Sequence, residues 1–274
     1  MKKETFLVVV PPQRLGELRG LNVVPGHLAY RVGQGPHLLR TGIPTAARGG
    51  LMVLDGQDWG GRGESGTFCQ EVVRECQARG FTGVICDFEG EATAMKLALL
   101  RELERHVCRR GWAMYVPECY GEAIPNAHVM VPSALSGGSL ELRLREVGER
   151  FGRGRVTLAL QRAAEDFLLP APRGSGTALT REELGRRMER LRPAVFFSRE
   201  LCARYFTYMT REGRPHFVLF DDADTLRQKL AVARQAGIST FLAAWPEVED
   251  AVGALGLCRE ETQTTKSEGK REKA

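Results

Sequence analysis

The segment of residues 81–90 ends in two carboxylates that are two positions apart. It reads FTGVICDFEG, with Asp87 and Glu89 after an apolar run that predicts a buried strand. Side chains two apart in a strand point to the same face, so both carboxylates would project from one side, with Cα atoms about 6–7 Å apart. Repulsion between them keeps a proton on one of the two near neutral pH. Such a pair cleaves glycosidic bonds; the alternative is a strand that ends in a solvated acidic loop.

The composition is that of a folded chain with a large core. The chain has 274 residues and is 43% hydrophobic, which is enough for one α/β barrel or two small domains. The net charge of +5 comes from 39 basic and 34 acidic residues. This excess is mild and spread over arginine-rich segments, so we expect no nucleic-acid partner. We also expect no membrane partner, since no segment reaches the roughly 18 apolar residues of a membrane span.

The N-terminal region and the cysteines bear on location. The apolar run at residues 6–10 is followed by Pro11 and Pro12, and it is shorter than the roughly 7–15 residues of a signal-peptide core. The seven cysteines are an odd number without a Cys-x-x-Cys pair or a metal-like spacing with the five histidines. We therefore expect reduced thiols in a cytoplasmic protein, unless it is exported by a route without a cleaved signal. We expect no metal and no cofactor, because no phosphate-binding glycine motif is present either.

Predicted strands and helices alternate along the chain. The strands are residues 6–10, 28–32, 51–54, 83–88, 113–116, 128–131, 156–160, 195–197, 216–220 and 240–244, and the helices are residues 67–79, 92–110, 140–151, 180–192 and 222–236. Near-continuous apolar strands are typical of a parallel sheet that is covered on both faces. The alternation favours a single (β/α)8 TIM-type barrel over an open doubly wound sheet. The first 50 residues are poor in predicted helices.

The sequence also predicts how the barrel closes and where it is interrupted. We expect strand 6–10 to pair with strand 240–244, and the hairpin at about residues 195–220 to lie outside the ring as an α+β insertion. The loop at residues 170–177 is rich in Pro, Gly and Ser. We therefore assign residues 1–258 to the barrel, with an insertion at about 170–221. Residues 259–274 are polar and are expected to be a disordered tail.

The last third of the chain resembles a known family. Its order of residues matches glycoside hydrolase family 18, and within it the branch of bacterial spore germination and cortex-lytic N-acetylglucosaminidases. In that branch a hairpin ending in Tyr-x-Tyr precedes a His-x-Val-x-Phe-x-Asp strand, a Ser/Thr-x-x-x-Lys-Leu helix, a Gly turn and a final strand that closes on Trp. The matching residues in this sequence are Tyr208, His216, Phe220, Asp221, Thr225, Lys229, Gly237 and Trp245.

The resemblance implies roles for the two carboxylates. The family carries Asp-x-x-Asp-x-Asp-x-Glu at the end of its fourth barrel strand; here Asp87 and Glu89 match the last two acids, while Thr82 and Ile85 stand in the first two places. Glu89 would be the general acid. Asp87 would orient the N-acetyl carbonyl of the substrate, which acts as the internal nucleophile.

One motif departs from the family. Its sixth strand ends in Met-x-Tyr-Asp, where the tyrosine supports the acetamido group, and this chain reads Met130-Val-Pro-Ser133. A lost hydrogen-bond donor to developing charge costs about 2.7–4 kcal/mol of transition-state stabilisation. Ser133, Tyr115 or Tyr120 would have to substitute, or the barrel no longer catalyses.

Further residues are candidates for substrate binding. Trp245 would form an apolar floor beneath the sugar, or else be an ordinary barrel-core residue. Glu118 and Gln161 follow strand ends and would face the barrel mouth, although Glu118 is equally a solvated loop acid. Other strand-end or helix-start residues have weaker claims: Asp55, Asp58 and Trp59 would line the groove or make turns, Arg162 would reach the sugar, and Asp221 and Asp222 would cap the helix that starts there.

Two functional hypotheses follow. The first is a glycoside hydrolase that acts on an N-acetylglucosamine-containing, peptidoglycan-like glycan by substrate-assisted retaining hydrolysis. The second is a catalytically reduced barrel that binds glycan or serves as a spore-associated scaffold. In either case we expect a monomer.

Overall fold

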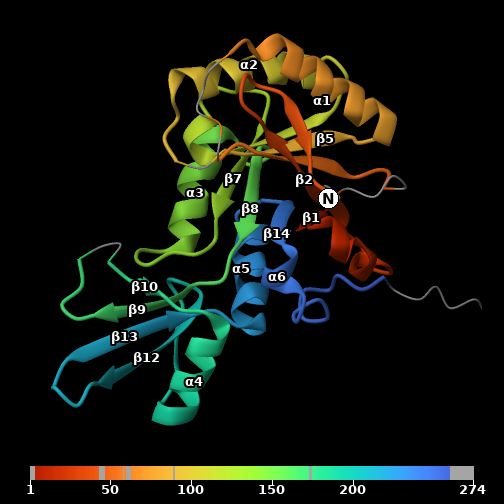
Figure 1. Ribbon diagram of the computed structural model, residues 1–274. Coiled ribbons are helices and arrows are strands. Elements are labelled where there is room, and N and C mark those ends of the chain that lie inside the picture. The colour runs from red at the N-terminus through yellow and green to blue at the C-terminus, as the bar shows by residue number, and fades with distance from the viewer. Residues whose placement is uncertain are drawn as a thin grey trace, which may run out of the picture.

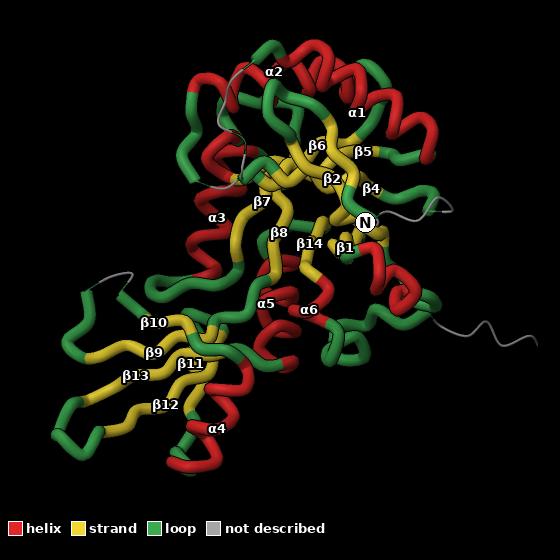
Figure 2. Tube along the Cα trace, in the orientation of Figure 1, coloured by secondary structure: helices red, strands yellow, loops and turns green. Residues whose placement is uncertain are grey.

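The computed structural model describes residues 4–42, 47–57, 59, 63–88, 90–172 and 175–259. Its centre is a closed ring of eight parallel strands (Figures 1 and 2). In ring order these are β1 (Thr5–Val10), β2 (Val24–Val32), β4 (Leu51–Asp55), β5 (Gly83–Asp87), β6 (Ala113–Pro117), β7 (His128–Pro132), β8 (Val156–Leu160) and β14 (Thr240–Ala244). β1 pairs in parallel with both β14 and β2, which closes the ring. The predicted TIM-type barrel and its closure by the first and last strands are confirmed.

The strands are apolar on both faces because each face has a core of its own. Alternate residues point into the ring, where Leu7, Val53 and Ile85 form the inner core. The intervening residues, such as Val84 and Cys86, point outward and pack under helices. The helices along the ring are α1 (Ser65–Arg79), α2 (Ala94–Cys108), α3 (Leu140–Phe151) and α5 (Ala223–Gln235).

Several connections of the barrel use 3-10 helices, a strand or a single helical turn in place of a long α-helix. The link after β1 is a 3-10 helix, η1 (Pro12–Leu18), and β2 is followed by the antiparallel strand β3 (Leu38–Arg40). The link after β6 is η2 (Glu118–Tyr120), and β14 leads into the short helix α6 (Trp245–Val248). The helix-poor start of the sequence thus corresponds to strands whose connections contain no α-helix among the described residues. In the part of the chain described here, no helix is long and apolar enough to cross a bilayer.

A second, antiparallel sheet lies outside the ring (Figure 1), and its strands come between β8 and α5 in the sequence. Its order is β10 (Thr177–Ala178), β9 (Ala164–Leu168), β13 (Pro215–Phe220), β12 (Ala203–Met209) and β11 (Phe196–Ser198). Helix α4 (Arg181–Leu191) covers one face of this sheet, where Met188 packs near Phe206 and Val218. The hairpin therefore lies outside the barrel, as predicted. The sequence analysis missed strands β9, β10 and β12, and with β9 the inserted sheet begins at Ala164.

A buried ion pair anchors this insertion to the barrel. Lys229 Nζ on α5 lies 2.5 Å from Asp221 Oδ2, and the two side chains are 1% and 0% exposed. Asp221 Oδ2 also accepts the backbone N–H of Ala163 at 2.7 Å, where the chain leaves the barrel for β9. The helix cap is made by the next residue: Asp222 accepts the N–H of Thr225, and the Thr225 hydroxyl accepts the N–H of Asp222. Of the two predicted caps, Asp222 is the one that the structure confirms.

Candidate active site

The carboxyl ends of the barrel strands surround a cavity of about 360 Å³. In barrels of this kind the catalytic groups lie at this end. The cavity wall combines apolar side chains with two acids and one amide: Val9, Val53, Ile85, Asp87, Pro117, Met130, Pro132, Ala159, Leu160, Gln161, Leu242, Ala244 and Glu247. Of the residues predicted for the site, Asp87 and Gln161 lie in this cavity.

Asp87 is held in place by the strand alternation of β5. The next residue, Phe88, is fully buried on the outer side and meets the ring of Trp59 edge-on, with centroids 6.5 Å apart. Because consecutive side chains point to opposite faces, this outward anchor turns Asp87 into the barrel. Asp87 pairs in register with Asp55 on β4, and Asp55 in turn lies opposite Arg31 on β2. Arg31 Nε is 3.2 Å from an Asp55 carboxylate oxygen. The three side chains on these neighbouring strands therefore place a cation at the β2 end and Asp87 at the β5 end.

Two predicted acids, Glu89 and Asp58, lie outside the described residues. The juxtaposition of Glu89 with Asp87 therefore stays a prediction from the sequence. Asp55 has a turn role as well as its ion pair, because one of its oxygens accepts the N–H of Gln57 at 3.0 Å. Trp59, which was considered for the groove, is buried in the outer core instead.

Ser133 is fully buried between the ends of β7 and β8. Its hydroxyl donates to the Gln161 carbonyl at 3.2 Å and accepts the Gln161 N–H at 3.1 Å. These bonds position Gln161 at the cavity rim. The hydroxyl is thereby engaged with the backbone, and a direct role in holding an acetamido group stays a prediction.

The two tyrosines considered as substitutes lie in cores. Tyr115 belongs to the inner barrel core and stacks on His128, with centroids 4.8 Å apart. Burial raises the pKa of Tyr115 and raises that of Tyr120 to about 12, so both phenols keep their protons at neutral pH. The Tyr120 hydroxyl is buried without a hydrogen-bond partner among the described residues, since η2 turns it into the outer core.

Glu118 and Trp245 are engaged with other parts of the chain. Glu118 forms an ion pair with Arg143 of α3 and lies 4.0 Å from Arg150. Trp245 is 5% exposed in the core between β1, β14 and α5. Its indole N–H donates to Glu17 at 2.7 Å. Their roles at the sugar stay predictions.

Glu247 is a cavity residue that the sequence analysis did not single out. Its carboxylate accepts the N–H of Arg162 at 2.7 Å, and its carbonyl accepts Arg162 Nε at 2.7 Å. Arg162, proposed from sequence to reach the sugar, thus ties the end of β8 to α6. The signal for Glu247 was its place just after the last barrel strand, because residues there face the mouth.

The residues of this mouth suit acid–base chemistry more than metal binding. Within the described ranges, no group of three or more His, Cys, Asp or Glu side chains is arranged to hold a metal ion. The cavity instead combines Asp87 and Glu247 with apolar walls. Apolar walls with a few convergent polar groups are typical of sites that bind organic ligands.

Comparison with known proteins identifies the fold. No protein-family model matches the sequence, and no curated protein matches it. Among solved structures, the spore cortex-lytic enzyme SleL of Bacillus megaterium QM B1551 is similar with a TM-score of 0.66 at 16% identity, over 92% of this chain and 74% of that one. A glycoside hydrolase family 18 N-acetylglucosaminidase from Paenibacillus barengoltzii gives 0.67 at 13% identity, over 92% and 99%.

A chitinase-like agglutinin from Robinia pseudoacacia has the same architecture, with a TM-score of 0.62 at 14% identity over 91% of this chain and 99% of that one. At these identities the likeness concerns the fold. The chain has the fold of glycoside hydrolase family 18 barrels, a group of structures that includes spore cortex-lytic enzymes. The resemblance found in the sequence is confirmed at that level.

Proposed function

We propose that this protein is a glycoside hydrolase that cleaves an N-acetylglucosamine-containing, peptidoglycan-like glycan. The observation that carries the proposal is Asp87, which lines a cavity at the carboxyl end of a barrel of this fold. The volume of about 360 Å³ lies within the range of about 300–1,000 Å³ for ligand pockets. It accommodates a sugar ring and its acetamido group better than a long polymer segment.

The proposed mechanism uses the substrate's own acetamido group. Asp87 accepts a hydrogen bond from the acetamido N–H and turns the carbonyl oxygen toward the anomeric carbon. Glu89 gives its proton to the leaving oxygen as the glycosidic bond breaks, and then takes a proton from the water that opens the cyclic intermediate. The apolar wall from Val53, Ile85 and Leu242 excludes water from the reacting group and strengthens these polar interactions.

The test is hydrolysis of a chromogenic N-acetylglucosaminide by the Glu89→Gln variant. We expect loss of turnover with the fold intact, as judged by circular dichroism. Glu247→Gln is the matched control, because this second cavity acid is bound to Arg162 and has no assigned proton-transfer role. Full activity of Glu89→Gln would move the general acid elsewhere, and loss only in Glu247→Gln would assign it to Glu247.

A second candidate function is glycan binding without catalysis, for example as a spore-associated scaffold. Two observations favour it: the Ser133 hydroxyl, at the departing motif, is bound to the Gln161 backbone, and an agglutinin has this fold. A protein of this kind would bind the glycan and release no reducing ends from it.

We further propose that the protein acts as a monomer inside the cell and has no nucleic-acid partner. The seven cysteines, an odd number without a Cys-x-x-Cys pair, support a reducing compartment. Fractionation of the native host tests the location, and sedimentation of the purified chain, with and without added DNA, tests the monomer and the lack of a nucleic-acid partner.

A further inference from the structure

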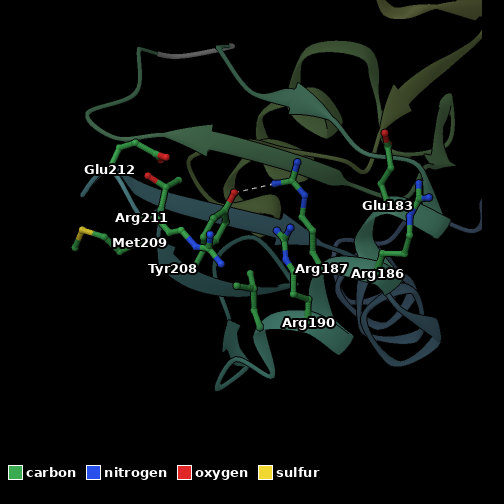
Figure 3. Close-up of a pocket in the computed structure, with 10 residues that line it drawn as sticks. Glu183, Arg186, Arg187, Arg190, Tyr208, Met209, Arg211 and Glu212 are labelled. Atoms are coloured by element: carbon green, nitrogen blue, oxygen red, sulfur yellow. Dashed lines mark hydrogen bonds between the residues drawn. The ribbon is translucent and has the colours of Figure 1, made fainter.

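A second large cavity in the described part of the chain lies in the inserted subdomain, away from the barrel mouth. It is a groove of about 970 Å³ between α4 and the hairpin formed by β12 and β13 (Figure 3). Its lining is dominated by arginine: Glu183, Arg186, Arg187, Arg190, Leu191, Tyr208, Met209, Thr210, Arg211 and Glu212.

Arg187 is fixed in the groove by a polar network. Its guanidinium donates to the Tyr208 hydroxyl at 2.9 Å (Figure 3). It also donates to the carboxylate of Asp166, a residue that is 7% exposed. Asp166 also pairs with His216 Nδ1 at 2.8 Å, and the rings of His216 and Tyr208 stack with centroids 4.7 Å apart. Because these hydrogen bonds already fix the Arg187 side chain, it loses little conformational entropy when it binds an anion.

Three other arginines of the groove add positive charge that few acidic side chains of the protein neutralise. Arg186 and Arg190 are four residues apart on α4 and therefore lie on one face, about 6 Å apart along the axis. Arg211 comes from the hairpin and extends toward α4 in Figure 3. Within the described ranges Arg190 and Arg211 form no ion pair, and Arg186 has only an exposed partner, Glu182, at 3.5 Å.

The acids of the groove stand at its ends. Glu183 accepts the N–H and the hydroxyl of Thr180 in a capping box at the start of α4. Glu212 lies in the turn of the hairpin. The middle of the groove is therefore positively charged between two negative ends. This pattern fits single negative charges spaced along a chain better than a dense row of phosphates.

The first turn of α4 contacts the segment that follows the last barrel strand. Arg181 donates to the carbonyl of Pro246, and Nη1 of Arg181 is 3.8 Å from Asp250. The residue after Pro246 is Glu247, which lines the mouth cavity.

We propose that this groove binds a glycan whose sugars carry carboxylate groups. Arginine suits this ligand, because its planar fork makes two parallel hydrogen bonds to a carboxylate. Arg187 would hold one carboxylate, and Arg190 with Arg211 would hold the next. The glycan part of this inference rests on the proposed function, whereas the anion part rests on the groove alone.

Fluorescence anisotropy of labelled oligosaccharides tests the proposal. The full chain with Glu89→Gln, which prevents cleavage, is titrated against an oligomer of alternating N-acetylglucosamine and its 3-O-lactyl ether, N-acetylmuramic acid. The comparison ligands are a neutral N-acetylglucosamine oligomer of the same length and a single-stranded DNA oligonucleotide. We expect the acidic glycan to bind at least about tenfold more tightly than the neutral one, with a preference that weakens at high salt.

The variants Arg190→Gln and Arg211→Gln together should remove that preference and leave binding of the neutral oligomer unchanged. Arg227→Gln, an exposed arginine of α5 away from the groove, is the matched control and should change neither. Equal affinity for both glycans, or equal weakening of both by the groove variants, would overturn the proposal. Tighter arginine-dependent binding of the DNA would replace it with a nucleic-acid site.

The proposed function is tested independently, by reducing-end release with the unaltered chain. Hydrolysis of both glycans without a preference in binding would support the proposed hydrolase activity and refute the proposed role of the groove. Arginine-dependent binding of the acidic glycan without any hydrolysis would support the proposed binding groove and refute the proposed hydrolase activity.

Discussion

Replacing Lys229 with methionine should strongly destabilise the protein. The change keeps most of the side-chain volume but leaves the Asp221 carboxylate in a fully buried site, with the Ala163 N–H as its remaining partner at 2.7 Å. Breaking a buried ion pair from one side costs about 3–5 kcal/mol. For a domain of this size that corresponds to a fall in Tm of roughly 6–20 °C. The free energy of unfolding is measured by urea titration, followed by circular dichroism and tryptophan fluorescence.

Two further variants separate charge from packing in this prediction. Adding Asp221→Asn to Lys229→Met should recover part of the lost stability, because an amide oxygen can still accept the Ala163 N–H and no buried charge is left unpaired. Arg227→Gln, exposed on the same helix, should change stability by less than about 0.5 kcal/mol. A loss below about 1 kcal/mol in Lys229→Met, or a double variant no more stable than it, would refute the reasoning.

Three other predictions follow from individual contacts. Burial opposes the charge of Asp166, but hydrogen bonds from its three partners outweigh this and lower its pKa. The charged carboxylate should therefore stabilise the fold above about pH 4, and this contribution should fade as the pH falls through the lowered pKa of the folded state. Urea midpoints between pH 5 and 3 should accordingly fall less steeply in Asp166→Asn than in the unaltered protein. Ser133→Ala should lower stability by about 1–3 kcal/mol, since it removes both hydrogen bonds between the buried Ser133 hydroxyl and the Gln161 backbone. It should reduce kcat less than tenfold; a 100-fold loss of kcat would show that the hydroxyl serves the substrate. Iodoacetamide at pH 7 should label the exposed Cys119 and Cys258 in the folded protein and spare the buried thiols of α1 and β5, whose pKa values are raised by burial, and mass spectrometry of tryptic peptides checks the pattern.

The barrel was predictable from the sequence because its strands are apolar on both faces. Runs such as residues 156–160 have every residue buried, so they stand out against their surroundings. The insertion was harder to predict. β9 carries Glu165 and Asp166, and the burial of Asp166 depends on His216, a partner 50 residues away. Sequence periodicity contains no such long-range information, and the strand was missed.

The candidate site was predictable where local geometry determines it. The position of Asp87 follows from strand alternation and from the rule that barrel sites lie at the carboxyl ends of strands. The partners of Ser133 and Trp245 do not follow from local sequence. Ser133 binds the backbone of Gln161 just after the next strand, and Trp245 binds Glu17 from the start of the chain. The first contact forms when β7 and β8 pair, and the second only when β1 and β14 close the ring.

The central claim is that the barrel mouth stabilises a charged intermediate formed by the acetamido group, next to Asp87. Isothermal titration calorimetry with a thiazoline analogue of N-acetylglucosamine, which mimics that intermediate, tests it most directly against the parent sugar. We predict that the analogue binds at least about 100-fold more tightly than the sugar, as transition-state analogues do, and that Asp87→Asn removes most of this preference. Equal, weak binding of the two ligands by the unaltered protein would contradict the account and leave a barrel that binds glycan without cleaving it.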